Sequence, residues 1–195
     1  MSNLTDFFPA TSSSNVLEVV QGTCDGRSIT VGSGTYTLGN VTTYQTFTQN
    51  YSDVTGSSIT YMPPANTKYV SYLFNFMWDA THATGISHWK LDIDGTDVYK
   101  SAKTFSSNYS GNSSHHHGNN TAFVYYVIDL TASSDDAVNG KFSSWTTPKT
   151  LKVRARDYRS STTTYYRAAA HYNVYYSTLS FSQYSKPNLT ITAYS

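Results

Sequence analysis

The dipeptide Asp94-Gly95 constrains the fold of this chain more than any other feature, because it separates two segments in which apolar and polar residues alternate. Both positions of such a tight turn need a positive φ, which Asp and Gly tolerate, so the pair predicts a β-hairpin. Alternation in the first arm places Trp89, Leu91 and Ile93 on one face. The turn also fixes which residues face one another across the hairpin: Ile93 and Thr96, Asp92 and Asp97, and Leu91 and Val98.

Further strand signals surround this hairpin and predict an all-β fold. Residues 68–78 form a run of Tyr, Val, Leu, Phe and Trp after the break at Pro63-Pro64, and the continuous apolar run at residues 121–130 predicts a central strand. β-Branched and aromatic residues dominate, which disfavours helices. Shorter strand candidates lie at residues 16–21, 28–31, 35–38, 43–48, 58–62, 150–158, 163–176 and 186–194. We therefore predict one antiparallel, jelly-roll-like β-sandwich domain over residues 16–195.

The charge of the chain is low and balanced in sign, which narrows the classes of partner. Charged residues make up 13% of the sequence and the formal net charge is +1, so neither a nucleic-acid nor a membrane partner is expected. A basic cluster does occur between residues 149 and 159. Alternation places its members Lys152, Arg154 and Arg156 on one strand face, which we interpret as a solvated surface.

The cellular compartment is indicated by the first residues and by the cysteine count. Residues 1–10 have neither the apolar core nor the basic leader of a signal peptide, which predicts synthesis in a cytoplasm. The single cysteine, Cys24, excludes a disulfide within the chain.

Two segments lack strand periodicity. The arm at residues 1–15 carries the aromatic plug Phe7, Phe8 and Pro9 ahead of a Thr/Ser linker. An aromatic pair on such a lead is suited to docking against a partner or a neighbouring subunit, so we interpret the arm as an anchor. Residues 101–120, which are rich in Ser, Asn and Gly, predict a long loop.

Two groups of residues are candidate metal ligands, and each has an alternative interpretation. Across the hairpin Asp92 faces Asp97, and like charges directly opposite one another destabilise a sheet. Their repulsion is relieved by Lys90 and Lys100, by solvation, or by a bound cation of the calcium type. The other group is the run His115, His116 and His117 in the long loop. If several subunits meet at this loop, their imidazoles surround a metal ion; otherwise the run belongs to an exposed polar segment. No cofactor is expected.

An enzyme is not expected either. The sequence contains no Gly-x-Ser-x-Gly elbow, no glycine-rich phosphate loop and no Cys/His metal-ligand spacing. A glycosidase needs two suitably spaced carboxylates. The acidic pairs Asp135-Asp136 and Asp92/Asp97 are predicted surface pairs without an aromatic platform beside them. We therefore assign no catalytic residue.

The chain has 18 tyrosines, many of them in its C-terminal half. Neighbouring tyrosines on a strand point to opposite faces, so one of each doublet is free to face outward. Outward tyrosines give a large contact area at low entropic cost and are enriched at protein interfaces, and the same rings stack on sugars. As candidates for contacts between subunits or with glycans we select Tyr126, Tyr166, Tyr175, Tyr176 and Tyr184.

The order of several segments resembles a known group of proteins. The segments are VLEVVQ, ITYMPPANTKYVSYLFNF, HWKLDIDGTDV, FSSWTTPKTLKVRARDY and LTITA, in that order. Together they resemble small tail-fibre-like and virion-surface proteins of marine bacteriophages, especially those that infect cyanobacteria, over about residues 16–195. The Phe-Phe-Pro of the arm is also similar to openings of phage tail-fibre proteins. The resemblance implies a trimeric or otherwise oligomeric β-module on the virion exterior and carries no catalytic residues.

These observations lead to one expected function and one alternative. We expect a non-enzymatic structural protein on a phage particle, either a capsid decoration or a short tail-fibre tip. The arm would join it to other virion proteins, and tyrosine contacts would join its own copies, as a trimer. The alternative is an adhesin that binds a glycan of the host cell surface.

Overall fold

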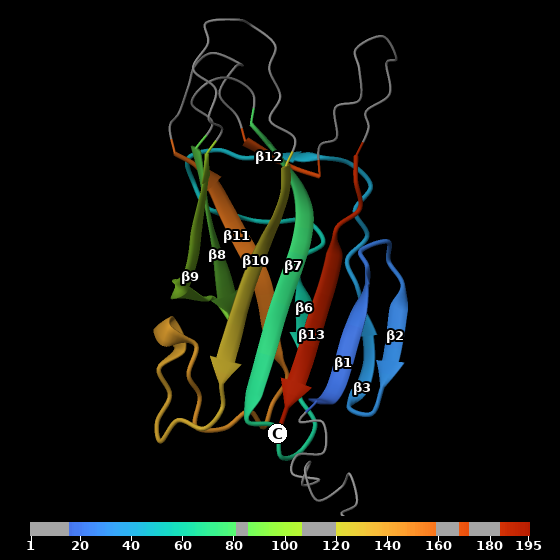
Figure 1. The fold of residues 1–195 in the computed structure, drawn as a ribbon, viewed down its shortest axis with the longest axis vertical. Helices are drawn as coiled ribbons and strands as arrows, with labels where there is room; N and C mark the ends of the chain where they lie inside the picture. Colours follow the sequence, from blue (N-terminus) through green and yellow to red (C-terminus); the bar gives the residue numbers. More distant parts are fainter. Residues whose placement is uncertain (1–15, 81–85, 107–119, 159–167, 172–183) are drawn as a thin grey trace, which may run out of the picture.

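The computed structural model describes residues 16–80, 86–106, 120–158, 168–171 and 184–195. Within these ranges the chain forms antiparallel sheets stacked as a β-sandwich, which confirms the predicted fold class (Figure 1). The one helical element there is the short 3-10 helix η2 (Ala137–Asn139). The strands are β1 (Val16–Thr23), β2 (Ser28–Val31), β3 (Gly34–Thr37), β4 (Gln45–Thr46), β5 (Ser52–Asp53), β6 (Ile59–Tyr61), β7 (Tyr69–Ala80), β8 (Ile86–Ile93), β9 (Thr96–Ser106), β10 (Asn120–Asp129), β11 (Lys149–Asp157), β12 (Ala168–Ala170) and β13 (Asn188–Tyr194).

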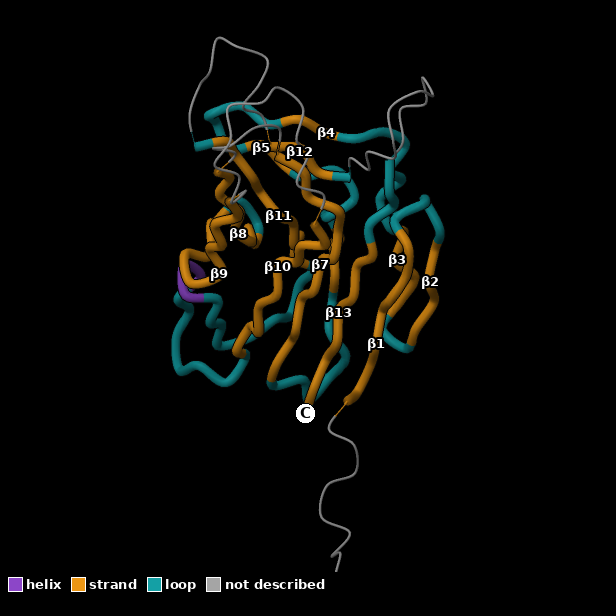
Figure 2. The backbone as a smooth tube through the Cα atoms, turned by 45° about the horizontal axis from the view of Figure 1, so that its top comes forward, coloured by secondary structure: helices purple, strands orange, loops and turns teal. Residues whose placement is uncertain are grey.

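The sandwich consists of two sheets, named here after their central strands. The β7 sheet has the order β1-β13-β7-β12-β4, and β10 also pairs with β7. The β11 sheet has the order β5-β11-β8-β9, with β6 also paired to β11, and β2 and β3 form a separate hairpin. Figure 2 shows the short strands β4, β5 and β12 gathered at one end of the sandwich. No helix of the described residues is long and apolar enough to span a membrane.

The predicted hairpin is confirmed in both turn and register. Asp94 and Gly95 adopt φ values of 50° and 85°, as the turn requires. Leu91 pairs with Val98, Asp92 with Asp97 and Ile93 with Thr96. Beyond this point the register shifts between Trp89 and Leu91, a bulge that the sequence pattern does not reveal. The Ser101 hydroxyl occupies the bulge, accepting a hydrogen bond from the Leu91 backbone N–H at 2.7 Å and donating to the Val98 carbonyl at 2.6 Å.

An aromatic cluster joins the two sheets in the core. Trp89 of β8 is fully buried, and its ring lies 4.6 Å from that of Phe76 of β7, centroid to centroid. Phe47 and Phe105 contact the same indole at 5.0 Å and 5.8 Å. The alternation that placed Trp89, Leu91 and Ile93 on one face therefore identifies the inward face of β8, since all three are buried.

Three details of the predicted strands are wrong. The run at 121–130 is an edge strand rather than a central one, because β10 pairs only with β7 among the described strands. The predicted loop 101–120 begins too early, since residues 101–106 continue β9 and Asn120 starts β10. Of the strand predicted at 163–176, the described residues form β12 (Ala168–Ala170), and His171 bends away with a φ of 66°.

Candidate functional site

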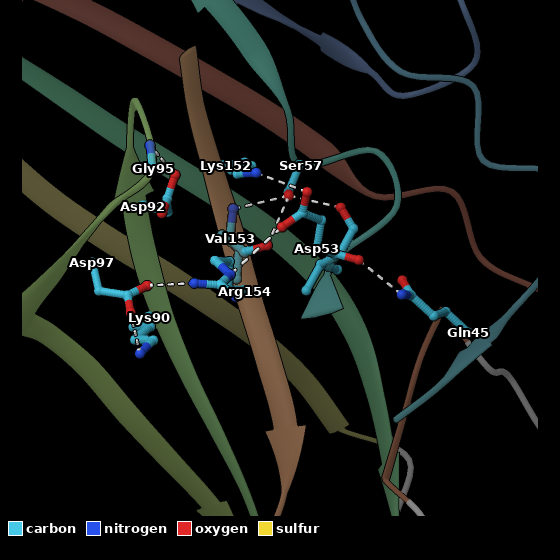
Figure 3. Close-up of polar contacts among 11 residues, drawn as sticks. Gln45, Asp53, Ser57, Lys90, Asp92, Gly95, Asp97, Lys152, Val153 and Arg154 are labelled. Carbon is cyan, nitrogen blue, oxygen red and sulfur yellow. Dashed lines mark hydrogen bonds and ion pairs between the residues drawn. The ribbon is translucent and has the colours of Figure 1, made fainter. Parts of the chain in front are cut away.

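The outer face of the β11 sheet carries a dense set of charged side chains, which we call the charged face (Figure 3). Alternation along β11 buries Leu151, Val153 and Ala155 completely and leaves the intervening basic residues half-buried on the outside. This is the shared face predicted for Lys152, Arg154 and Arg156. Lys90 and Asp92 of β8 and Asp97 of β9 extend the same face, because they stand beside these residues in the sheet register.

Two carboxylates organise the cations of this face. Asp97 accepts a hydrogen bond from Lys90 Nζ at 2.6 Å and another from Arg154 Nη1 at 3.1 Å. Asp53 of β5 accepts a hydrogen bond from Lys152 Nζ at 2.8 Å, and its Oδ1 lies 3.6 Å from Arg154 Nε. Arg154 therefore links the two acids, and four strands are joined through side chains as well as backbone.

The ring of Tyr51 lies among these cations. Lys90 Nζ is 3.7 Å from the ring centroid, and the Cζ atoms of Arg156 and Arg154 are 5.4 Å and 5.9 Å away. A tyrosine face attracts cations electrostatically, and the attraction is larger where water is excluded. Tyr51 therefore supports the close grouping of like charges that the carboxylates alone would leave unbalanced.

Asp92 faces Asp97 as predicted, and the structure separates their environments. Asp97 is neutralised by Lys90, one of the two predicted lysines, whereas the Asp92 side chain caps the turn, with Oδ1 accepting from the Gly95 backbone N–H at 2.9 Å. Asp92 is 1% exposed, and its Oδ2 has no hydrogen-bond partner. Among the described residues no group of three or more His, Cys, Asp or Glu is placed to hold a metal ion.

Replacing Asp97 with asparagine is expected to lower the free energy of unfolding by about 2 kcal/mol, because the nearly buried Lys90 ammonium and Arg154 both lose their charged acceptor. The matched variant is Asp53→Asn, which also removes one carboxylate from this face. The Asp53 side chain is 56% exposed against 22% for Asp97, so we expect a cost of about 0.5 kcal/mol for Asp53→Asn. Urea unfolding measures both values, and equal costs would contradict the ranking.

The outer face of the β7 sheet is of the opposite character, and we call it the uncharged face. On β10 the outward side chains Phe123, Tyr125 and Val127 are 52%, 44% and 41% exposed. Val127, Ser71, Thr192 and Val19 form one row across four neighbouring strands. No side chain is charged from Thr121 to Val127 on β10, at residues 69–77 of β7, or at the outward positions of β13 and β1. Asp79, the next residue of the same β7 series, is 1% exposed. Tyr69 of β7 adds another exposed ring at 40%.

The structure shows which tyrosine of the Tyr125-Tyr126 doublet in β10 faces outward. Tyr126 turns inward, where it is half-buried and its hydroxyl donates to the Asn139 carbonyl at 2.7 Å. Burial, and secondly the charge of Asp136, raise the pKa of this phenol. The outward member is Tyr125, and Phe123 and Val127 beside it were not selected from the sequence. Their signal, alternation within β10, is hidden because the inward residues are apolar too.

The other candidate site residues named from the sequence fall into two groups, one inside and one outside the described residues. Tyr184 is 37% exposed, with Lys186 Nζ 5.8 Å from its ring centroid. The remaining ones lie outside the described residues, so their predicted roles stay predictions: Phe7, Phe8, Pro9, His115, His116, His117, Tyr166, Tyr175 and Tyr176.

A cleft of about 520 Å³ lies between the Pro63-Pro64 segment and the segment that contains Trp145. Its lining combines apolar side chains with hydroxyl and amide groups, among them Leu130, Asn66 and Thr67, and none of the described residues that line it is ionisable. The Trp145 indole N–H is directed away from solvent and donates to the Tyr61 carbonyl at 3.2 Å.

Comparison of the sequence with protein-family models and with curated proteins finds no match.

Proposed function

We propose that this chain is a non-enzymatic structural module of a bacteriophage virion exterior, and that it assembles with its own copies through the uncharged face. The expected assembly is a trimer. The observation that carries the proposal is the contrast between the two outer faces of one sandwich: the charged face is covered with ion pairs, and the uncharged face presents aromatic and aliphatic side chains.

The composition of the uncharged face supports contact with protein rather than with water. The buried centres of protein interfaces are depleted in charged residues and enriched in Tyr and Phe. Burying Phe123, Tyr125 and Val127 against a second copy removes apolar surface from water and desolvates no charge. The formal net charge of +1 adds little repulsion between copies.

The position of β10 in the sheet also supports the uncharged face as the contact between copies. Among the described strands β10 pairs only with β7, so no described strand lies along its other edge, which is met at Asp129 by an isolated bridge to Lys141. Natural edge strands commonly carry lysine or proline, which prevent pairing with other chains. Residues 120–128 of β10 contain neither, and the outward side chains of Phe123, Tyr125 and Val127 are apolar or aromatic. Such an edge is suited to a neighbouring subunit.

The virion assignment rests on the resemblance of the segment order to phage virion-surface proteins. A β-sandwich whose charged face meets solvent while its uncharged face meets other copies fits a capsid decoration or a short fibre tip. The ion pairs on the charged face satisfy most of its acids and bases with one another, which favours a structural role for them over catalysis.

Light scattering on the full-length protein tests the assembly. We expect a mass three times that of the 21.6 kDa chain. Tyr125→Lys is expected to reduce the mass to that of one chain, because it places an ammonium in every copy of the contact, where burial of a charge costs several kcal/mol. The matched control is Tyr99→Lys, at a 67% exposed tyrosine of β9 outside the uncharged face, and should leave the mass unchanged.

The same variants test the location. We expect the wild-type protein and Tyr99→Lys to co-purify with intact phage particles and to be accessible there to antibodies. A monomeric wild-type protein, or a Tyr125→Lys variant with an unchanged mass, would contradict assembly through the uncharged face. Absence of the oligomeric wild-type protein from particles would contradict the virion role alone.

A further inference from the structure

Arg156 is an exception on the charged face. On β8 and β11, Lys90, Lys149, Lys152 and Arg154 each have a carboxylate oxygen within 3.5 Å. No acid of the described residues pairs with Arg156, whose Cζ lies 5.4 Å from the Tyr51 ring centroid. Among the described residues the N–H donors of this guanidinium meet no acceptor. A half-buried guanidinium of this kind favours bidentate binding of a carboxylate or sulfate group.

Two further groups stand beside this guanidinium. His88 is directly opposite Arg156 in the β8–β11 register. The His88 ring lies 5.8 Å from the ring of Tyr158 at an interplanar angle of 65°, and Tyr158 is 57% exposed. His88 Nδ1 is 3.1 Å from the Thr104 hydroxyl of β9, so the other ring nitrogen is left to meet a ligand. Strands β8 and β11, together with the residue that follows β11, therefore bring an imidazole, a cation and an exposed phenol ring to one patch.

The protonation state of His88 at neutral pH also suits contact with a ligand. Burial first, and the charge of Arg156 second, lower the pKa of this imidazole below its usual value of 6.5. At neutral pH the ring is therefore uncharged and able to exchange a hydrogen bond with a hydroxyl group. The patch offers one positive charge, one neutral hydrogen-bonding ring and one aromatic face.

We propose that Arg156, His88 and Tyr158 form a binding site for an acidic polysaccharide, with Arg156 binding the carboxylate or sulfate of one sugar unit. Tyr158 stacks against the face of the sugar ring, and His88 bonds a neighbouring hydroxyl. The site lies on the charged face and does not require the uncharged face, so it adds host-surface recognition to the proposed assembly role without depending on it.

The surrounding charges favour a polysaccharide over a nucleic acid. Asp97 and Asp53 lie on the same face, within ion-pair distance of Arg154. A nucleic acid carries a phosphate at every nucleotide and is bound through continuous basic surfaces, so these carboxylates would repel it. A sugar chain with single, separated acidic groups needs one unpaired cation flanked by aromatic and hydroxyl-bonding groups.

Calorimetric titration of the full-length protein tests the proposal with four probes. Polygalacturonate presents carboxylates, dextran sulfate presents sulfates, unmodified dextran is the neutral control, and oligothymidylate represents nucleic acid. We expect binding of at least one acidic polysaccharide, the stronger one identifying the anion, and no binding of dextran. Arg156→Gln should weaken that binding about tenfold or more, the effect of losing a charge-assisted bidentate contact.

Lys149→Gln is the matched control, since it removes one positive charge from the same strand, at a position where Asp94 is already its partner. Its effect should stay within about twofold. Tyr158→Ala, at an exposed position, provides a second test that does not depend on Arg156→Gln folding, and should weaken binding about threefold or more. Light scattering on each variant shows whether a lost affinity reflects lost assembly.

Several results would overturn the site. One is the absence of binding to both acidic polysaccharides, and another is equal binding of unmodified dextran. Equal effects of Arg156→Gln and Lys149→Gln would reduce the interaction to general attraction of charge. Oligothymidylate binding at least as tight as that of the polysaccharides, and equally sensitive to Arg156→Gln, would assign the face to nucleic acid instead.

Discussion

Replacing Trp89 with alanine is expected to lower the free energy of unfolding by about 4 kcal/mol, because the loss combines buried apolar surface with the cavity left behind. The indole is fully buried and contacts the rings of Phe47, Phe76 and Phe105 across the two sheets. Its N–H also donates to the Ser87 hydroxyl at 2.7 Å, which the Trp78 N–H reaches at 2.9 Å. Alanine therefore removes the side chain that holds the sheets together and one of two donors to Ser87.

Urea unfolding followed by circular dichroism, at one fixed protein concentration, measures this loss. The control is Tyr99→Ala on the adjacent strand β9, where a 67% exposed ring is truncated and the expected change is below about 0.5 kcal/mol. A cost for Trp89→Ala below about 1 kcal/mol would mean that the inter-sheet cluster is not the main packing contact of the fold.

The hairpin around Asp94-Gly95 could be predicted in full because its determinants are local. The turn conformation follows from two adjacent residues, and the register follows from the turn. The bulge a few residues away could not be predicted, since it depends on the Ser101 hydroxyl satisfying the Leu91 N–H. Serine in a strand has no signal that distinguishes such a role from an ordinary outward position.

The edge position of β10 was mistaken for a central one for a definite physical reason. Apolar residues on both faces of a strand indicate that both faces are covered, and the usual cover is a second layer of the same domain. In β10 the inward residues Ala122, Val124 and Ile128 pack in the core, while Phe123 and Tyr125 remain exposed. The periodicity of a sequence shows that a strand face is apolar. It does not show whether the same domain or another molecule covers that face.

The organisation of the charged face also lay beyond the sequence. Alternation correctly grouped Lys152, Arg154 and Arg156, but their partners come from distant parts of the chain. Asp53 and Tyr51 precede β11 by about a hundred residues and join it only through the short pairing of β5. No local sequence pattern indicates such a contact. Only the folded chain shows that Arg156 has no acidic partner among the described residues, whereas its neighbours Lys152 and Arg154 do.

His171 was not selected from the sequence, and the fold places it in an unusual state. It is fully buried, with its ring set edge-on to those of Phe74 and Phe76. Nε2 lies 2.9 Å from the Thr55 carbonyl, so Nε2 carries the proton and donates, whereas Nδ1 has no hydrogen-bond partner. A second proton on Nδ1 would create a buried charge whose N–H meets no acceptor.

Stability is therefore expected to fall on acidification by about 3 kcal/mol on account of His171 alone. Burial lowers the pKa of this imidazole from 6.5 to about 4 in the folded chain. Between these two values the unfolded chain binds a proton that the folded chain does not, so the free energy of unfolding decreases as the pH falls from 7 to 4. Above pH 6.5 neither state is protonated, and the contribution of His171 no longer changes with pH.

Comparing the wild-type protein with His171→Asn isolates this contribution, because the acidic residues titrate in both. Asparagine tolerates the positive φ of 66° at this position and has no titrating group. The variant should be the less stable protein at pH 7, where it loses the ring contacts and the bond to Thr55. By pH 4 the difference between the two should shrink by about 3 kcal/mol, since only the wild-type protein loses stability through this residue. His88→Asn, on the half-buried charged face, should change the pH dependence less. Unfolding curves that keep the same separation from pH 7 to pH 4 would show that His171 takes up its proton without opening the fold.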